Sequence, residues 1–223
     1  MPINQDLLNG INAALGAAVT PSLTAASSTN DLYEAYVFSV VLEVAKSEGG
    51  TVAFSDMHGN TPSILLFRTG PSVLYHATQN YCHGIIQFAA KPTLELHQGV
   101  YARGISKVRH ELDVSVIWKD EADTCRASQV DPRYNKVVLA AECKMYQTSY
   151  LTVKLGREFI GYATDLRGVT TSFVANKQAN SLEKLLVQHK KNRALSVIPT
   201  NSTRVNQLKA TIQTAFQDFK TKN

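Results

Sequence analysis

The sequence predicts a mixed α/β fold in which one central mixed β-sheet is flanked by helices. The chain has 223 residues, a length that fits one large domain with a buried core. Hydrophobic residues make up 44% and charged residues 18% of the chain, which excludes a disordered protein. Helical periodicity at the start changes to strand-like patterns after Gly50, and helices and strands alternate from residue 149 onward. This order is typical of α/β or α+β proteins built around one sheet.

Two helices are predicted before Gly50. Residues 5–19 carry leucine, isoleucine and valine at the spacing of one helix face. A polar loop follows, so residues 1–30 are interpreted as an N-terminal helix and loop. Residues 31–47 form the second predicted helix, because an asparagine or an aspartate can cap its start and a pair of glycines ends it.

Strands are predicted over the next hundred residues. Residues 110–118 alternate over most of their length, and residues 136–146 alternate in their second half. The polar stretch between them, residues 119–135, is predicted to be a loop. The predicted strands and extended segments are 51–55, 62–68, 72–77, 83–89, 93–103, 110–118 and 136–146.

Helices and strands alternate in the last third of the chain. A helix over 149–165 places Leu155, Phe159 and Tyr162 on one side. Residues 177–223 are interpreted as a C-terminal helical extension packed on the same domain. The later predicted elements are a strand at 170–175, a helix at 181–190, a strand at 194–198 and a helix at 202–220.

The formal net charge of +5 is unevenly distributed along the chain. Residues 1–60 carry a net charge of −5, residues 61–182 carry +4, and residues 183–223 carry +6. An acidic start and a basic end favour an anionic partner, with nucleic acid first among the candidates. The alternative is that the lysine-rich helices are simply solvated.

The sequence also limits the compartment in which the protein works. No stretch approaches the ~18 uninterrupted apolar residues of a membrane span, so no membrane partner is expected. The first ten residues have no basic segment of the kind that opens a secretory signal. Three scattered cysteines are too few for a disulfide framework or a cysteine zinc site. A cytoplasmic location is expected.

Two acids and a lysine stand out in the predicted strands at 110–118 and 136–146. Because side chains alternate along a strand, Glu142 and Lys144 share one face, and Asp113 can meet them if the two strands pair. Carboxylates are hard oxygen ligands for Mg²⁺, and a metal ion polarises a phosphoryl group. A nearby lysine can orient the attacking water and offset phosphate charge. The alternative is an ordinary charged solvent face of two strands.

Glu34 is a third candidate acid. At ~100° per residue it lies on the apolar stripe of the helix 31–47, whereas Glu43 points to the opposite side. A carboxylate on a buried stripe is costly unless it is paired or binds a cation. Glu34 is therefore a candidate companion of the strand acids, although an acid in the first turn of a helix is also favoured by the helix dipole.

These residues resemble the PD-(D/E)XK nuclease superfamily, which has the restriction-endonuclease-like fold. Glu34 matches the acid of the first core helix, Asp113 matches the strand aspartate, and Glu142 with Lys144 matches the Glu-x-Lys motif. The resemblance covers roughly residues 31–176 as a nuclease core. The chain departs from the family name at Leu112, which stands in place of proline, and in having extra strands before Asp113.

The resemblance implies roles for the site residues. Asp113 and Glu142 would bind Mg²⁺, for which Mn²⁺ can substitute, together with the backbone carbonyl of Cys143. Lys144 would position or activate the water, and Glu34 would support a metal ion or a water. Further nucleic-acid contacts are predicted at Gln147, Lys154 and Arg157 and, from its place near a glycine loop, at Arg103.

The sequence therefore predicts a Mg²⁺-dependent endonuclease acting on DNA, with RNA left open. A homodimer is expected if it cuts both strands, and a restriction or phage-defence role fits small members of this fold. The alternative is a non-catalytic nucleic-acid-binding or interaction module that keeps the fold.

Two histidine-containing patterns suggest other metal sites, but neither is supported by its spacing or by further motifs. Asp56 and His58 resemble the first metal motif of calcineurin-like phosphoesterases, but the further motifs are missing, and the segment is interpreted mainly as a turn. His97 and His110 are not at a spacing that indicates a metal pair.

Overall fold

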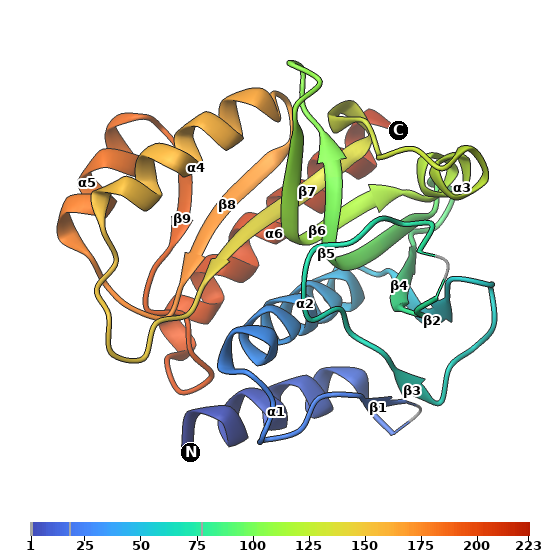
Figure 1. Cartoon of the computed structure of the whole chain (residues 1–223), viewed down its shortest axis with the longest axis horizontal. Coiled ribbons are helices and arrows are strands. Elements are labelled where there is room, and N and C mark those ends of the chain that lie inside the picture. The colour runs from blue at the N-terminus through green and yellow to red at the C-terminus, as the bar shows by residue number, and fades with distance from the viewer. Residues whose placement is uncertain (1, 18, 77) are drawn as a thin grey trace.

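A mixed β-sheet forms the centre of the computed structural model, which describes residues 2–17, 19–76 and 78–223 (Figure 1). Within these residues the sheet has seven strands in the order β2-β4-β5-β6-β7-β8-β9. The predicted fold class, a central mixed sheet flanked by helices, is confirmed. The strands are β2 Thr51–Asp56, β4 Cys82–Gln87, β5 Leu94–Arg103, β6 Arg109–Trp118, β7 Val137–Lys144, β8 Thr170–Ala175 and β9 Asn192–Ala194.

The sheet is antiparallel from β2 to β7 and parallel from β7 to β9. Parallel neighbours need a long crossover connection, and a helix provides it in each case. Helix α4, Val153–Asp165, connects β7 to β8, and helix α5, Asn180–Gln188, connects β8 to β9. A small parallel pair, β1 Thr20–Pro21 and β3 Ile64–Leu65, lies apart from the main sheet.

Three helices pack together on one face of the sheet. Helix α2, Thr29–Ser47, packs against the sheet. It also packs against α1, Pro2–Leu15, and against α6, Ser202–Lys222 (Figure 1). Nearly all of its residues from 32 to 45 are buried for this reason, rather than one stripe only. Apolar side chains of all three helices belong to one hydrophobic cluster with sheet residues such as Val114, Ala141 and Cys143.

The opposite face is covered by α4, α5 and a short helix, α3, Lys119–Ser128. Phe159 of α4 packs edge-on against Phe173 of β8, with 5.5 Å between the ring centroids. The small side chains of Ala140 and Ala175 let these helices approach the sheet closely. This packing fixes the position of α4 relative to β7, and the candidate site lies between these two elements and α2.

Helix α3 corrects the predicted loop at 119–135. Its sequence is so polar that only Glu121, Ala122 and Cys125 are buried, and no apolar stripe marks it as a helix. Ala122 and Cys125 pack into the cluster under this face, and Asp123 pairs with both Lys119 and Arg126, at 2.6 and 2.7 Å. A 3₁₀ turn at Tyr134–Lys136 follows before β7.

Two predicted strands are also shorter than expected. The segment 62–68 pairs only at Ile64–Leu65, and among the described residues 72–76 only Ser72 forms a bridge, to Val100. A proline and a glycine directly before Ser72 limit regular pairing there. The predicted elements 5–19 and 72–77 each contain one residue, at positions 18 and 77, that lies outside the described residues.

The three cysteines, Cys82, Cys125 and Cys143, are buried free thiols. In the part of the chain that the structure describes, no helix combines the length and the apolar character needed to cross a bilayer.

Candidate active site

The site lies where β6 and β7 stop pairing. The last paired residues of this ladder are Val114 and Ala141, so Asp113 and Glu142 stand directly beyond the last pair. Here the backbone N–H of Cys143 donates a 2.7 Å hydrogen bond to Oδ2 of Asp113. A side-chain carboxylate thus replaces the strand partner that the β6 backbone no longer provides.

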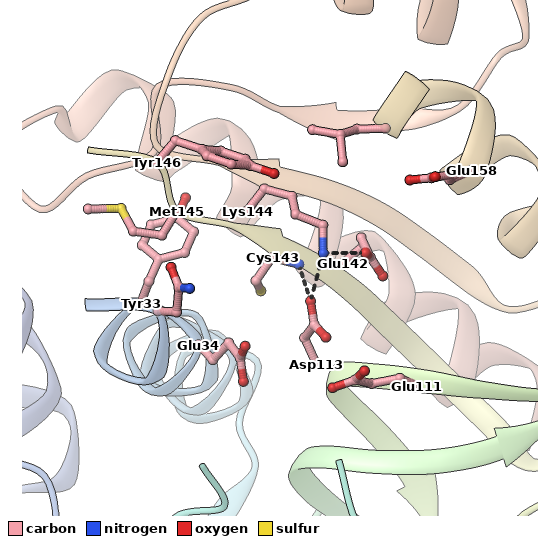
Figure 2. A pocket seen from close by; sticks show the side chains of 12 residues that line it. Tyr33, Glu34, Glu111, Asp113, Glu142, Cys143, Lys144, Met145, Tyr146 and Glu158 are labelled. Carbon is pink, nitrogen blue, oxygen red and sulfur yellow. Dashed lines mark hydrogen bonds and ion pairs between the residues drawn. The ribbon is translucent and has the colours of Figure 1, made fainter. Parts of the chain in front are cut away.

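A cavity of about 390 Å³ opens at this fork. Figure 2 shows the side chains of Glu34 from α2, Asp113 from β6 and Lys144 from β7 lying around it. The structure therefore brings together the four residues predicted to be catalytic. The residues that line the cavity are Asn30, Tyr33, Glu34, Glu111, Asp113, Glu142, Cys143, Lys144, Met145, Tyr146, Leu155 and Glu158.

Glu34 reaches the cavity because of its position on the first turns of α2. Val37, Phe38 and Val41 on the same stripe are buried against the sheet, and Glu34 continues that stripe to the edge of the packed region. Gln98 of β5 donates a 3.3 Å hydrogen bond to Oε2 of Glu34. On the other side of the helix, Glu43 forms a 2.7 Å ion pair with a lysine of α6, as its predicted orientation requires.

Lys144 is held between the two strand acids. Its Nζ lies 2.5 Å from Oε1 of Glu142 and 3.9 Å from Oδ2 of Asp113. Pairing with β8 continues through Lys144, which is opposite Ala175, so this part of β7 keeps its extended geometry. Burial lowers the pKa of Lys144, but Asp113 and Glu142 outweigh it and raise the pKa above its ordinary value. Lys144 is therefore protonated at neutral pH.

The acids of the cavity are difficult to ionise together. Burial, and then the negative charge of Asp113 and Glu111, raise the pKa of Glu34 to about 9. Burial and the charge of Glu142 raise the pKa of Asp113 to about 7, although Lys144 and the Cys143 N–H oppose this. The metal-free cavity consequently retains protons on carboxylates that are ionised in free solution.

The donor set fits a hard divalent cation. Five acidic side chains, Glu34, Glu111, Asp113, Glu142 and Glu158, line the cavity with a single lysine. Carboxylate oxygens are the ligands that Mg²⁺ and Mn²⁺ prefer, and a bound cation would allow the acids to ionise. The thiol of Cys143 is buried under α2, and burial raises its pKa, so only the backbone of Cys143 is suited to such a site.

The predicted nucleic-acid contacts lie in different places. Lys154 and Arg157 are both exposed on α4, the helix that also brings Glu158 to the cavity. Gln147 follows β7 and donates a 2.8 Å hydrogen bond to Thr29 beside the start of α2. Arg103 does not line the cavity; it lies at the end of β5, 3.3 Å from Asp131.

Two acids of the cavity were not predicted as site residues. Glu111 precedes Asp113 by two residues and so shares its strand face, which is a signal that the alternation of the strand contains. Burial and the charge of Glu142 raise the pKa of Glu111. Glu158 lies on α4, and no local pattern indicates which side of that helix faces the fork.

Asp56 and His58 form a turn, as predicted. Oδ1 of Asp56 accepts hydrogen bonds from the backbone N–H groups of His58 and Asn60, at 2.8 and 2.9 Å. Oδ2 accepts from the side chains of Asn60 and Asn80. Burial opposes these bonds, but together they lower the pKa of Asp56. Four hydrogen bonds from the turn and from Asn80 thus already occupy the two oxygens of this carboxylate.

Comparisons of the chain with known protein families, curated proteins and solved structures find no match. The chemistry of the site therefore rests on its own geometry.

Proposed function

We propose that the protein is a Mg²⁺-dependent endonuclease that hydrolyses phosphodiester bonds of DNA, and that it belongs to the PD-(D/E)XK superfamily. One observation supports this above all. Glu34, Asp113, Glu142 and Lys144, which come from three elements far apart in the sequence, line one cavity at the β6–β7 fork. Burial raises the pKa of both Glu34 and Asp113, whereas the acids of an ordinary solvent-exposed face would keep pKa values close to those in free solution.

In this proposal some residues of the cavity bind the cation and others position the water. Asp113, Glu142 and the backbone carbonyl of Cys143 would hold the metal ion, and Glu34 would support it from α2. Bound Mg²⁺ supplies Lewis acidity that polarises the phosphoryl group and makes water a better nucleophile. Lys144 is charged at neutral pH, so in this proposal it orients the water and stabilises the negative charge of the phosphate rather than acting as a base.

A polynucleotide fits the charge distribution of the chain. The acidic first segment delivers Glu34 to the cavity, whereas the basic surplus lies after residue 60 and includes Lys154 and Arg157 on α4. Exposed lysine and arginine side chains of this kind can bind the phosphates that flank a scissile bond. A cytoplasmic role in restriction or phage defence, with a homodimer for double-strand cuts, completes the proposal.

Cleavage by the purified full-length chain tests the proposal. Plasmid DNA, single-stranded DNA and RNA are incubated with Mg²⁺, Mn²⁺ or EDTA, and the ends of the products are mapped. We expect metal-dependent cleavage of DNA that leaves 5′-phosphates and is lost in Asp113→Asn. Lys222→Met, which removes an exposed lysine on α6, is the control and should cleave normally.

Three results would contradict the proposal. The first is cleavage of RNA alone, and the second is cleavage that persists in EDTA. The third is tight DNA binding without any cleavage by the unmodified chain, which would favour the non-catalytic binding module.

A further inference from the structure

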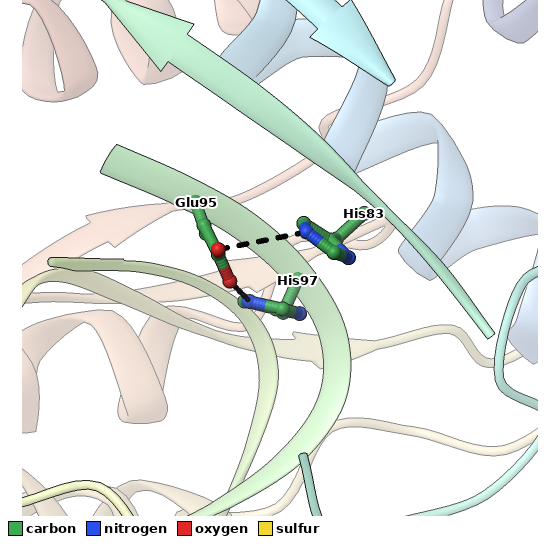
Figure 3. A group of neighbouring side chains, drawn as sticks. All are labelled: His83, Glu95 and His97. Carbon is green, nitrogen blue, oxygen red and sulfur yellow. Dashed lines mark hydrogen bonds and ion pairs between the residues drawn. The ribbon is translucent and has the colours of Figure 1, made fainter. Parts of the chain in front are cut away.

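A second group of ligand-type side chains lies on the antiparallel half of the sheet. His83 of β4 and Glu95 and His97 of β5 point to the same face (Figure 3). The pairing of Gly84 with Leu96 places His83 directly opposite His97, and Glu95 lies diagonally next to them. All three are at most 4% exposed. They are separate from the carboxylates of the β6–β7 fork.

The atoms of this group are spaced like metal ligands. Nε2 of His97 lies 2.9 Å from Oε2 of Glu95, and Nε2 of His83 lies 3.6 Å from Oε1 of Glu95. One ligand atom from each residue lies within 4.8 Å of the others. Zinc bonds of about 2.0–2.2 Å in a tetrahedral site place ligand atoms roughly 3.4 Å apart. Small side-chain movements would therefore complete such a site.

We propose that His83, Glu95 and His97 bind a Zn²⁺ ion. Two imidazoles and one carboxylate suit zinc, whereas Mg²⁺ and Ca²⁺ prefer oxygen ligands alone. A cavity of about 440 Å³ borders His83 and Glu95 and gives an ion a path of entry. This site does not depend on the proposed nuclease activity.

Neighbouring groups can support the three ligands. Arg126 of α3 donates hydrogen bonds of 3.0 and 2.7 Å to the two oxygens of Glu95 and so fixes the orientation of the carboxylate. Nδ1 of His97 and Oγ of Ser115 are buried and have no hydrogen-bond partner among the described residues. Ser115 is directly opposite His97 in the β5–β6 ladder. A metal ion on Nε2 of His97 would fix the proton on Nδ1, and Oγ of Ser115 could accept a hydrogen bond from this N–H group.

The competing explanation is a network that contains no ion. Arg126 already balances the charge of Glu95, and Lys119 of α3 lies 4.0 Å from the same carboxylate. Such a network would tie α3 to the sheet through charge-assisted hydrogen bonds. The two explanations differ in whether the isolated chain takes up zinc.

The experiment uses the full-length chain after removal of metals with a chelator. Zn²⁺ alone is titrated by calorimetry, and X-ray absorption spectra of the zinc-loaded protein report its ligands. We expect a Zn²⁺ ion with two imidazole ligands, and about tenfold or greater loss of affinity at that site in His83→Gln and His97→Gln. His58→Gln, which changes a histidine of the same cavity that is not in the ligand group, is the matched control.

The spectrum of the unmodified protein keeps the test decisive if a histidine variant fails to fold. Two imidazole ligands identify the ion with this group, because none of the described residues that line the cavity at the β6–β7 fork is a histidine. The proposal is overturned if the unmodified chain takes up no Zn²⁺, if the bound Zn²⁺ has no imidazole ligand, or if both histidine variants bind it unchanged.

Discussion

The backbone N–H of Cys143 donates a 2.7 Å hydrogen bond to Oδ2 of Asp113, directly beyond the last paired residues of β6 and β7. This bond joins the two halves of the candidate site, because Cys143 separates Glu142 from Lys144 in the sequence. It holds a carboxylate that is only 6% exposed next to a second acid. The site is thus arranged around acids whose charge must be balanced, and this leads to testable consequences.

The contribution of Glu34 to the stability of the metal-free protein should fall as pH rises. Its pKa is about 9 in the folded chain and 4.5 as the ordinary value, so between these pH values the unfolded chain loses the proton first. The stability that protonated Glu34 provides is complete below pH 4.5 and is lost as pH rises toward 9. Each pH unit within this window costs at most about 1.4 kcal/mol.

Urea unfolding of Glu34→Gln and of the unmodified chain in EDTA checks this. Glutamine keeps an oxygen that can accept the hydrogen bond from Gln98 but cannot ionise. The advantage of the variant in unfolding free energy should therefore grow with pH. Glu43→Gln, which alters a half-exposed acid on the other side of α2, is the control and should show no such growth. A constant difference for Glu34→Gln across this range would contradict the assignment.

Mg²⁺ binding should release protons. Asp113 has a pKa of about 7 in the metal-free protein, so a bound cation must displace its proton in a fraction of the molecules at neutral pH. We expect affinity for Mg²⁺ to increase between about pH 6 and about pH 8. Calorimetry in two buffers with different ionisation enthalpies measures the number of protons released. Binding without proton release at the lower pH would be inconsistent with Asp113 as a ligand.

Replacement of Lys144 by methionine should remove activity more than stability. The methionine keeps the length of the side chain but removes the charge that lies 2.5 Å from Glu142. We expect cleavage to fall by about 10²-fold or more. The neighbouring acids are half-buried or buried and can take up protons once the lysine charge is gone, which limits the loss of folding free energy. Lys209→Met removes a lysine from a 2.7 Å pair with Glu43 and is the matched control. Equal activity of the two variants would exclude a role for Lys144 in cleavage.

The basic residues of α4 should act through phosphates. Lys154→Ala and Arg157→Ala should each weaken DNA binding at all sequences and reduce the salt slope of the affinity by about 1. Arg103→Ala should have a smaller effect, because Arg103 pairs with Asp131 away from the cavity. Binding curves over a range of salt concentrations measure this. The same loss in all three variants would instead place DNA along the β5–β6 end of the sheet.

Alternation along the strands is strong enough to predict the centre of the site from sequence. Asp113, Glu142 and Lys144 meet because β6 and β7 pair, and that pairing follows from two adjacent apolar segments. Glu158 could not be predicted, since its side chain reaches the cavity only through the way α4 packs on β8.

Cross-strand contacts are the other limit of prediction from sequence. His83 and His97 are opposite each other because of the register of β4 and β5, whereas their separation along the chain has no recognisable spacing. Helix α3 escaped prediction because only two of its apolar side chains, Ala122 and Cys125, are buried, too few to form a visible helical pattern. Both failures concern contacts that do not leave a periodic pattern in the sequence.

The position of α6 has a consequence for synthesis on the ribosome. Lys220 of α6 forms a 2.7 Å ion pair with Glu48, which directly follows α2, although 172 residues separate the two. Phe216 and Phe219 of α6 complete the hydrophobic cluster that holds α2 against the sheet. The nascent chain therefore exposes part of this apolar cluster until α6 has been synthesised.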